Sequence, residues 1–342
     1  VNIMKPKNSN CKDLVSIIIP LYNTDKDVFK RCLLSIEKQD YTNYEVIIID
    51  DYSSENYSNL IKFHAQNIDI KYEKLDHNYG PGVARRIGLT MAEGKYTTFM
   101  DSDDEFYDNT SLMKLVKEMD NNPKLDMVSG LAYEEYKDGS LEKRDKNFIW
   151  VFGKLFRTQF FVENKMNFND TRANEDNGFT TLFRMLTDNY KFIDEIVYIW
   201  HYEPNSITRK NGHEYYFYSI EGYVNNMIWV YNECKKRGID KGIKQQKHFI
   251  SVWIRLYFYA IEVLYDRDID SANLLSVWCH NYYDSVYKYI ENNIEMDMFM
   301  DCWNTMVASS PATFIERIIN ISYPDFYSII SSGEPFITDN EN

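Results

Sequence analysis

A run of β-branched residues near the start of the sequence, Val15-Ser16-Ile17-Ile18-Ile19-Pro20, leads directly into Leu21-Tyr22-Asn23. Comparable runs follow, each short and apolar enough to be a strand buried on both faces of a sheet. We expect strands at residues 14–20, 45–50, 68–75 and 96–101. Segments with helical spacing lie between them, at residues 24–38, 54–66 and 82–92. This alternation of strand and helix predicts a parallel sheet with crossover helices.

The alternation weakens after Asp108, and the second half of the chain has a different pattern. We expect a helix at residues 111–119, a strand at 126–131 and a hairpin at 137–140. From His213 onward the amphipathic pattern is helical. The helical stretches cover residues 214–237, 244–265, 271–292 and 294–309. The sequence therefore predicts an α/β domain over residues 1–210 and a helical domain over 211–342, joined at residues 205–212.

Length and composition exclude an intrinsically disordered, collagen-like or low-complexity chain. A chain of 342 residues with 44% hydrophobic and 26% charged residues is long and apolar enough to fold as about two domains. A net charge of −14 makes nucleic acid an unfavourable main partner. The five cysteines form no CxxC pair, which favours reduced thiols over disulfides or a zinc site.

Apolar runs in the sequence fall short of a membrane span, and the start of the chain lacks the apolar region of a signal peptide. We therefore expect a cytoplasmic protein without a transmembrane segment. The aromatic content of 16% leaves room for peripheral contact with the inner face of the membrane.

Acidic residues gather where the fourth expected strand ends, in Met100-Asp101-Ser102-Asp103-Asp104. Asp101 and Asp103 lie two residues apart, so in an extended chain their side chains point the same way. Paired carboxylates at the carboxyl end of a sheet suit Mg²⁺ or Mn²⁺, which can in turn hold a nucleotide diphosphate. Alternatively, these acids cap the next helix.

The other strand ends also carry polar groups. Asp50 and Asp51 end the second strand, and Pro20, Tyr22 and Asn23 end the first. A carboxylate in this place can accept hydrogen bonds from a base or a ribose, although Asp is also an ordinary turn residue.

A glycine-bearing turn precedes the third helix, in Asn78-Tyr79-Gly80-Pro81-Gly82-Val83-Ala84-Arg85-Arg86. It does not satisfy GxGxxG, because Arg85 stands at the third glycine position. A P-loop is also excluded, because Gly88 and Gly94 are one residue too far apart. A helix N-terminus followed by arginines can bind a pyrophosphate or a base; the alternative is that both arginines lie on a solvated helix face.

Four segments carry a family resemblance: those at the ends of the first, second and fourth expected strands, and the turn before the third helix. Their order and spacing resemble those of family 2 glycosyltransferases over about the first 110 residues. The resemblance implies a GT-A fold, a nucleotide-diphospho-sugar transferase with a Rossmann-like sheet, followed here by helices. It implies an inverting transfer, dependent on Mn²⁺ or Mg²⁺, from a UDP-sugar to a hydroxyl of a glycan, wall polymer or glycoprotein. Two positions depart from the family pattern, since Tyr52 stands where glycine is usual and Arg86 where asparagine is usual.

Downstream segments extend the resemblance. Residues 150–156, which begin with Trp150, are similar to the family's sugar- and acceptor-lining segment, and Glu175-Asp176 resembles its Glu-Asp motif. The resemblance implies that Asp176 is the catalytic base; the alternative is an acidic first turn of a helix. Residues 198–209 are similar to a family segment that closes over the diphosphate. This resemblance implies that His201 is a metal ligand. The alternative is that His201 packs against aromatic side chains.

Taken together, the resemblance implies three groups of residues. The catalytic base is Asp176, and the metal ligands are Asp101, Asp103 and His201. Asp50 and Arg85 are expected to hold the nucleoside. The full nucleotide-sugar site comprises Pro20, Tyr22, Asn23, Asp50, Asp51, Asn78, Gly80, Arg85, Asp101, Ser102, Trp150 and Glu175.

Other interpretations stay open at this point. Aromatic residues recur at helical spacing in the second half, which favours core packing and also allows a carbohydrate platform or a homo-oligomer contact. A catalytically silent scaffold that binds nucleotide sugars is one rival function. Glycosylation of modified DNA bases is the other.

Overall fold

The computed structural model describes residues 13–204, 212–265, 269–309 and 322–336. The chain forms two compact units, residues 1–210 and 211–342. The expected junction at residues 205–212 lies outside the described residues except for Gly212.

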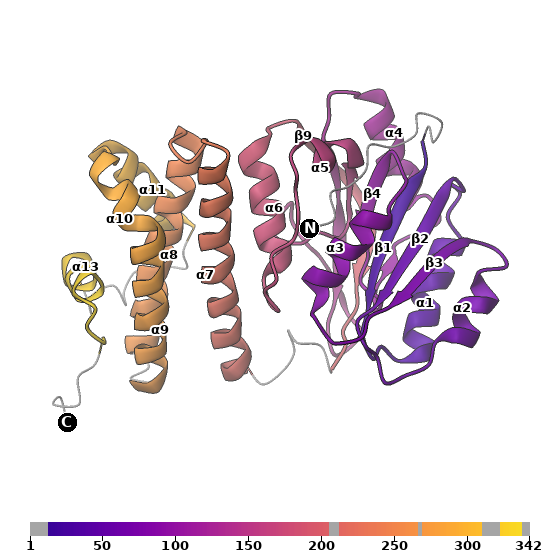
Figure 1. The fold of residues 1–342 in the computed structure, drawn as a ribbon, viewed down its shortest axis with the longest axis horizontal. Helices are drawn as coiled ribbons and strands as arrows, with labels where there is room; N and C mark the ends of the chain where they lie inside the picture. Colours follow the sequence, from indigo (N-terminus) through magenta and orange to yellow (C-terminus); the bar gives the residue numbers. More distant parts are fainter. Residues whose placement is uncertain (1–12, 205–211, 266–268, 310–321, 337–342) are drawn as a thin grey trace. The chain divides into compact units, whose positions relative to one another are not determined.

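The first unit contains a mixed sheet in the order β3-β2-β1-β4-β8-β6-β9-β5, in which β7 also pairs with β6 (Figure 1). The four predicted strands are confirmed as a parallel set. They are β1 (Val15–Leu21), β2 (Tyr44–Asp50), β3 (Asp69–Lys74) and β4 (Tyr96–Phe99). The remaining strands are β5 (Glu105–Phe106), β6 (Met127–Glu135), β7 (Leu141–Lys143), β8 (Lys154–Arg157) and β9 (Tyr190–Trp200). β8 runs antiparallel to β4, so the parallel half continues as a mixed half. In it the predicted strand at 126–131 is confirmed as part of β6, and the predicted hairpin at 137–140 joins β6 to β7. β8 and β9 were not predicted.

Local chemistry sets the starts of the helices that cover this sheet. They are α1 (Lys26–Glu37), α2 (Ser58–His64), α3 (Pro81–Met91), α4 (Ser111–Asn121), α5 (Thr158–Glu163) and α6 (Glu175–Leu186). Asp25 caps α1 by accepting a hydrogen bond from the Asp27 backbone N–H at 2.8 Å. α3 begins at Pro81, directly after Gly80, whose φ of +94° is one that glycine adopts readily.

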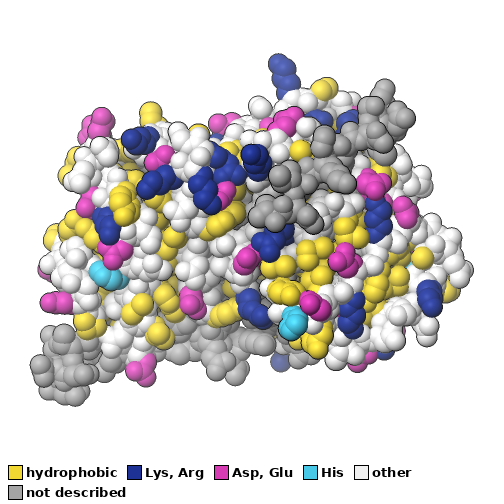
Figure 2. Space-filling view, viewed as in Figure 1, with side chains coloured by type: hydrophobic (Ala, Val, Ile, Leu, Met, Phe, Trp, Pro, Cys, Tyr) yellow, Lys and Arg dark blue, Asp and Glu magenta, His cyan; other side chains and the backbone are white. Residues whose placement is uncertain are grey.

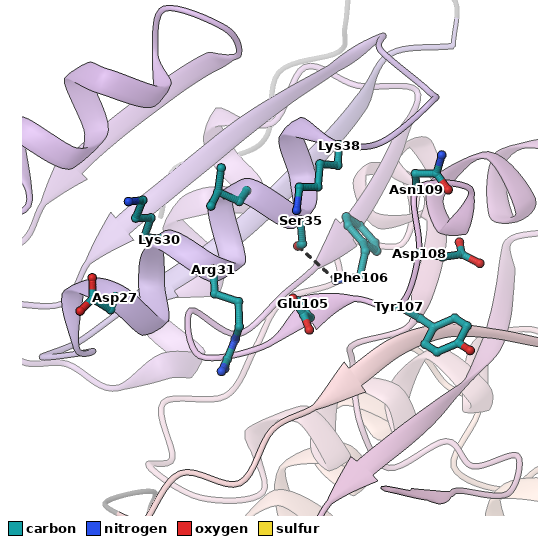
Figure 3. Close-up of a pocket in the computed structure, with 11 residues that line it drawn as sticks. Asp27, Lys30, Arg31, Ser35, Lys38, Glu105, Phe106, Tyr107, Asp108 and Asn109 are labelled. Atoms are coloured by element: carbon teal, nitrogen blue, oxygen red, sulfur yellow. Dashed lines mark hydrogen bonds between the residues drawn. The ribbon is translucent and has the colours of Figure 1, made fainter. Parts of the chain in front are cut away.

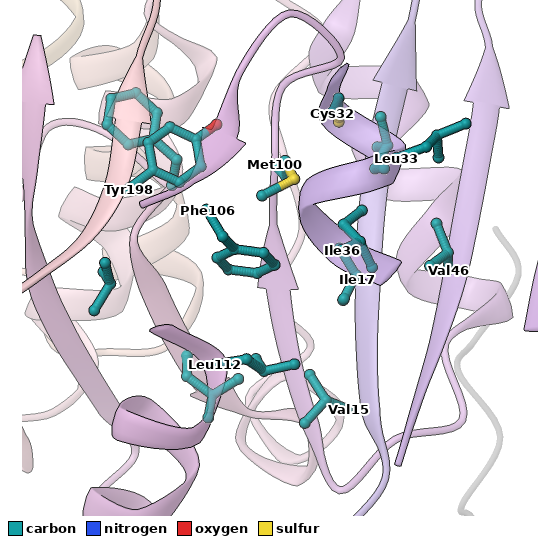
Figure 4. Close-up of a cluster of buried hydrophobic side chains, with 14 of the residues drawn as sticks. Val15, Ile17, Cys32, Leu33, Ile36, Val46, Met100, Phe106, Leu112 and Tyr198 are labelled. Carbon is teal, nitrogen blue, oxygen red and sulfur yellow. The ribbon is translucent and has the colours of Figure 1, made fainter. Parts of the chain in front are cut away.

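Alternate residues of the strands pack two separate apolar layers. On one face, Ile17 and Val46 pack with Leu33 of α1 and Leu112 of α4 (Figure 4). On the other face, Ile18 lies against α3, because a methyl group added at Gly88 would come within 2.4 Å of the Ile18 side chain. Aromatic rings fill the rest of that second layer, with Phe99, Phe156, Phe161, Phe168, Phe179 and Phe183 in mutual contact.

The described part of the second unit is helical, as predicted. Its helices are α7 (Gly212–Lys236), α8 (Ile243–Tyr265), α9 (Ile269–Tyr282), α10 (Lys288–Ile290), α11 (Met296–Ala308) and α13 (Tyr323–Ser332), with a π-helical turn at Tyr283–Tyr287. Trp253 is fully buried and stacks on Tyr287 with 4.4 Å between ring centroids. The core-packing interpretation of these aromatic residues is therefore confirmed for Trp253, Tyr257, Phe258, Tyr282 and Tyr287, all buried.

None of the helices within the described ranges combines the length and the apolar character that crossing a bilayer requires. The four described cysteines, Cys32, Cys234, Cys279 and Cys302, are buried free thiols.

Gly94 gives a test of the close packing of the turn before β4 against the starts of β1 and β4. A Cβ atom at this position would lie 2.6 Å from the Tyr96 carbonyl oxygen and 2.7 Å from the Leu14 carbonyl oxygen, and backbone atoms cannot move aside cheaply. We expect Gly94→Ala to lower the free energy of unfolding in urea by about 1–3 kcal/mol. Glu93→Ala is the matched control, because the Glu93 side chain is 64% exposed. Equal stabilities for the two variants would contradict the packing described here.

Candidate functional site

The carboxyl ends of β2, β1 and β4 lie next to one another, because these strands are adjacent and parallel. They bring the segments that begin at Asp50, Tyr22 and Asp101 to one edge of the sheet. α3 and α6 begin near the same edge, since Arg85 of α3 bonds both Asp101 and Glu175. Residues that are up to 90 positions apart in the sequence therefore meet in one place.

Asp51 fixes the turn before α3. One carboxylate oxygen accepts the backbone N–H of Tyr79 and the other accepts that of Gly80, both at 2.7 Å. The Asn78 side-chain amide donates to the Asp51 backbone carbonyl at 3.4 Å. The structure thus brings Asp51, Asn78 and Gly80 together. The Asp51 carboxylate fixes the shape of the turn through its two hydrogen bonds.

Asp50 is fully buried. Its oxygens accept hydrogen bonds from the Ser53 backbone N–H and from the Tyr72 hydroxyl, each at 2.7 Å. In this structure the Asp50 carboxylate shapes the 50–53 loop from within.

Three tyrosines at this edge are exposed, namely Tyr22, Tyr52 and Tyr79. Tyr52 stacks on the His77 ring at 6.0 Å between centroids and an interplanar angle of 16°. The φ of Tyr52 is +70°, which explains why glycine is usual at this position in the family that the sequence resembles. Asn23 accepts a hydrogen bond from the Ser54 backbone N–H at 2.8 Å, and this bond ties the end of β1, which includes Pro20, to the 50–54 loop. Flat, exposed rings of this kind offer stacking surfaces to a base.

Arg85 lies at the centre of the site and is buried. It donates to Glu175 Oε1 and to Asp101 Oδ1, each at 2.6 Å. Burial lowers the pKa of its guanidinium, but the charges of Asp101 and Glu175 raise it more, so Arg85 stays charged. The alternative of a solvated helix face is therefore wrong for Arg85, whose terminal nitrogens hold these two acids. The solvated-face interpretation suits Arg86, which pairs with the exposed Asp170.

The acidic cluster after β4 divides into residues with different surroundings. Ser102 Oγ and Thr24 Oγ1 share a hydrogen bond at 2.6 Å. Asp104 is buried and accepts hydrogen bonds from the Tyr198 hydroxyl at 2.8 Å and the His201 backbone N–H at 2.9 Å. Helix capping does not explain the cluster, because the next helix begins only at Ser111.

Asp101 and Asp103 are the acids of this cluster that remain available. The Asp101 side chain is 32% exposed, and only its Oδ1 is engaged by Arg85. Burial and the neighbouring charge of Asp101 raise the pKa of Asp103 to about 6. Two hard oxygen donors that repel each other are a donor set that a divalent cation stabilises. The pair therefore fits Mg²⁺ or Mn²⁺. Across the described ranges, no three His, Cys, Asp or Glu side chains are already gathered as a metal site.

His201 does not fit the role of metal ligand. Its Nδ1 lies 2.7 Å from Glu135 Oε2, and its Nε2 lies 3.0 Å from Glu105 Oε1. Burial lowers the pKa of His201, but the hydrogen bonds with Glu105 and Glu135 raise it more. Both ring nitrogens of His201 are therefore engaged by carboxylates in this structure. Asp101 and Asp103 are the predicted ligands whose surroundings suit a metal.

Asp176 and Trp150 complete the predicted set. Glu175 and Asp176 form the first turn of α6, so the helix-start interpretation of this pair is also correct. Burial and the charge of Glu175 raise the pKa of Asp176 to about 7, against the opposing effect of Arg85. Trp150 is half-buried and stacks on Phe152 at 5.2 Å between centroids. Asp176 thus has the pKa of a proton acceptor poised near neutrality.

A cavity of 330 Å³ lies behind the acidic cluster, between α1 and residues 105–109 (Figure 3). Ser35 accepts the Phe106 backbone N–H there at 3.2 Å. Arg31, which also lines the cavity, donates to the Asp103 backbone carbonyl at 2.5 Å. The cavity wall therefore supports the loop that carries Asp103.

Sequence reasoning missed several residues that build this site. Tyr198 anchors Asp104 and also accepts the Asp101 backbone N–H at 3.1 Å. Lys154 is buried on β8, and burial lowers its pKa to about 7. Tyr198 belongs to β9, which the sequence pattern did not predict. Lys154 had one available signal, a lysine that follows an apolar Trp-Val-Phe-Gly segment.

Comparisons with known proteins identify related sequences. A family model described as Glycosyl transferase family 2 matches residues 16–188. Glycosyltransferase GlyG of Streptococcus pneumoniae is 27% identical over 224 residues, which cover 58% of this chain and 73% of GlyG. The uncharacterized glycosyltransferase YibD of Escherichia coli is 42% identical over 100 residues, which cover 29% of this chain and 28% of YibD. The chain thus matches less than a third of the length of YibD.

The crystal structure of a third relative is known. Poly(ribitol-phosphate) β-N-acetylglucosaminyltransferase TarS of Staphylococcus aureus is 35% identical over 102 residues, which cover 29% of this chain and 17% of TarS. The crystal structure of TarS 1–349 in complex with UDP-GlcNAc matches with a TM-score of 0.58 at 16% identity, covering 95% of this chain and 93% of that one. The predicted GT-A fold with a helical C-terminal region is confirmed by this likeness.

Arg85 and Arg86 are adjacent residues with opposite surroundings, which makes them a matched pair. We expect Arg85→Ala to lower the free energy of unfolding by about 3–5 kcal/mol, because it leaves the buried Glu175 and the partly buried Asp101 near each other without a counter-ion. Arg86→Ala removes an exposed pair with Asp170 and should cost less than about 1 kcal/mol. Urea unfolding of both variants measures the difference. A loss for Arg85→Ala no larger than that for Arg86→Ala would contradict the central role of Arg85.

His201 predicts a pH dependence of stability. Because its pKa is raised in the folded state, its pairs with Glu105 and Glu135 stabilise the fold below the ordinary histidine pKa of about 6.5. This contribution is lost as the pH rises through the raised value. The stability deficit of His201→Gln should therefore be largest at pH 6 and shrink by pH 9, as measured by urea midpoints. His77→Gln is the control, because the His77 side chain is 75% exposed. A deficit for His201→Gln that grows with pH would refute the assignment.

Proposed function

Since the chain belongs to glycosyl transferase family 2, we propose that it transfers a sugar from a UDP-sugar to a hydroxyl group of a wall polymer or related glycan. One observation carries the proposal: Arg85 binds Asp101, at the end of β4, and Glu175, the neighbour of Asp176. A pair of carboxylates suited to a metal–diphosphate group is thereby linked to a carboxylate suited to proton transfer. Sugar transfer from a nucleotide diphosphate needs both functions on one molecule.

The relatives support UDP as the donor nucleotide. TarS was solved with UDP and with UDP-GlcNAc, and its name describes transfer of N-acetylglucosamine to poly(ribitol phosphate). In this chain, the exposed rings of Tyr22, Tyr52 and Tyr79 surround the turn fixed by Asp51, and they would receive the base. Basic and acidic side chains both occur on the face shown in Figure 2. With the net charge of −14, this surface favours a glycan over a nucleic acid as acceptor.

Asp101 and Asp103 would hold Mn²⁺ or Mg²⁺, and when bound the cation would stabilise negative charge on the diphosphate. Ser102 keeps the loop in place through its bond with Thr24, and Arg31 holds the Asp103 backbone carbonyl. These contacts fix the two carboxylates before a substrate arrives, which reduces the ordering that binding must supply.

Asp176 would act as the general base. Its carboxylate would take the proton of the acceptor hydroxyl while the hydroxyl oxygen attacks the anomeric carbon and the bond to UDP breaks. A single displacement of this kind inverts the configuration at the anomeric carbon. Trp150, stacked on Phe152, would line the sugar side.

Calorimetric titration of UDP, with Mn²⁺ and then with EDTA, tests the proposal on the wild type and two variants. We expect wild-type binding to require the metal and Asp103→Asn to lose that metal-dependent part. Asp176→Asn should bind UDP like the wild type, but its transfer rate should fall by about 10²–10⁴-fold, because it lacks the base.

Thr90→Ala is a neutral control, since the Thr90 side chain is exposed on α3 and bonds only within its own helix. Metal-dependent UDP binding that survives in Asp103→Asn would refute the metal assignment. An undiminished transfer rate in Asp176→Asn would place the base elsewhere.

A further inference from the structure

A basic segment joins α7 to α8 in the second unit. Residues 235–247 contain six Lys or Arg residues and one acid, Asp240, in a chain whose net charge is −14. The basic residues are Lys235, Lys236, Arg237, Lys241, Lys244 and Lys247. Lys and Arg side chains also gather at the upper left of Figure 2, over the second unit. This acidic protein therefore carries a local excess of positive charge at one helix connection.

The backbone holds the turn between these two helices in shape. The Gly238 N–H donates to the Lys235 carbonyl and the Gly242 N–H donates to the Ile239 carbonyl, each at 3.0 Å. α8 begins directly after this turn, at Ile243, and its first turn contains no acidic residue. The positive end of the α8 helix dipole therefore adds to the charge of the lysines. Because the turn is already ordered, a partner that binds it has little ordering to supply.

α10 brings a further lysine and a tyrosine to this end of the helices. The Lys235 ammonium nitrogen lies 4.9 Å from the centroid of the Tyr289 ring, and the Lys288 nitrogen lies 5.5 Å from it. Tyr289 is 54% exposed, and Ile243 is 68% exposed. Lysines and apolar side chains thus share one surface, which we call the basic tip. It consists of Lys235, Lys236, Lys241, Ile243, Lys288 and Tyr289.

Acidic side chains neutralise only part of the charge of the basic tip. Glu233 pairs with Lys236 and Asp284 pairs with Lys288, each at 2.7 Å, and Asp240 lies in the turn itself. Exposed pairs of this kind contribute little energy, so their ammonium groups can still attract another anion. The other two lysines of the basic tip form no ion pair with any residue that the structure describes.

The mixture of cations and apolar groups points to one kind of partner. A soluble polyanion would be held by the lysines alone. A bilayer with anionic headgroups also accepts apolar side chains, because isoleucine and tyrosine can enter the boundary between headgroups and acyl chains. We propose that the basic tip docks the protein on a membrane surface that carries anionic lipid, with Ile243 and Tyr289 inserted at the interface. This docking does not depend on the proposed sugar transfer.

Co-sedimentation of the full chain with lipid vesicles tests the docking. We expect binding to mixed vesicles of phosphatidylglycerol and phosphatidylcholine. Binding to phosphatidylcholine alone should be about tenfold weaker or more, because anionic headgroups supply most of the attraction for lysine. Raising NaCl from about 0.1 M to about 0.5 M should release the protein from the anionic vesicles, since salt screens exposed charges. A wild-type chain that does not bind the anionic vesicles would overturn the proposal.

Lys235→Gln/Lys241→Gln removes two charges of the basic tip and should lower the affinity for anionic vesicles about tenfold or more. Lys62→Gln/Lys117→Gln is the matched control, because it removes two exposed lysines on α2 and α4 of the first unit. We expect the control to stay within about twofold of the wild type, since distant charges are screened. Equal losses in the two double variants would contradict a specific role for the basic tip.

Ile243→Ser separates a membrane partner from a soluble polyanion. It should weaken vesicle binding about five- to tenfold, because serine gains nothing from the apolar interface, and it should leave binding of polyphosphate unchanged. Leu274→Ser is the control, because Leu274 is 50% exposed on α9, about 20 Å of helix before Tyr289. Unchanged vesicle affinity in Ile243→Ser would refute the membrane and make the basic tip a polyanion site. Thermal unfolding checks that each variant is folded.

Discussion

The buried guanidinium of Arg85 is the interaction on which the site depends. Its two bonds, each 2.6 Å long, join the end of a parallel strand to the first turn of a helix that begins 74 residues further along the chain than Asp101. Without a positive charge between them, Asp101 and Glu175 would repel each other in a region shielded from water. Arginine suits this position better than lysine, because its planar fork can hold two acids in fixed directions at once.

Several acids near this edge are structural, and their burial shows it. Asp50, Asp51 and Asp104 each accept two hydrogen bonds and are almost inaccessible to solvent. They hold the loops that follow β2 and β4 in place. By contrast, Arg85 donates to Oδ1 of Asp101 and the Asn177 backbone N–H donates to Oδ1 of Asp176, which leaves the second oxygen of each carboxylate for other partners. Aspartate is thus the residue type both of the acids that hold the loops and of the acids proposed to bind the metal or accept the proton.

The sequence predicted the order of the parallel half of the sheet well, because β1 and β2 are short β-branched runs. It was wrong to expect a buried strand at 68–75, because β3 is the edge strand and is largely exposed. It did not predict β9, where Lys191, Asp194 and Glu195 interrupt the apolar pattern on a strand that is partly exposed. That gap affected the site directly. Tyr198 anchors the acidic cluster from β9, and His201 follows its end, so the surroundings of both were invisible to pattern reasoning.

Sequence alone also could not separate acids of the same motif. Asp103 and Asp104 are adjacent, yet Asp104 bonds Tyr198 and the His201 backbone, whereas Asp103 faces Asp101. The two acids differ because β9 and the residues after it contact Asp104, and only the folded structure brings these segments together. The same holds for the protonation of Asp176: burial and the charge of Glu175 raise its pKa, and Arg85, which reaches this region from α3, lowers it. The protonation state of that carboxylate is therefore set by α3 and α6 together, and neither segment determines it alone.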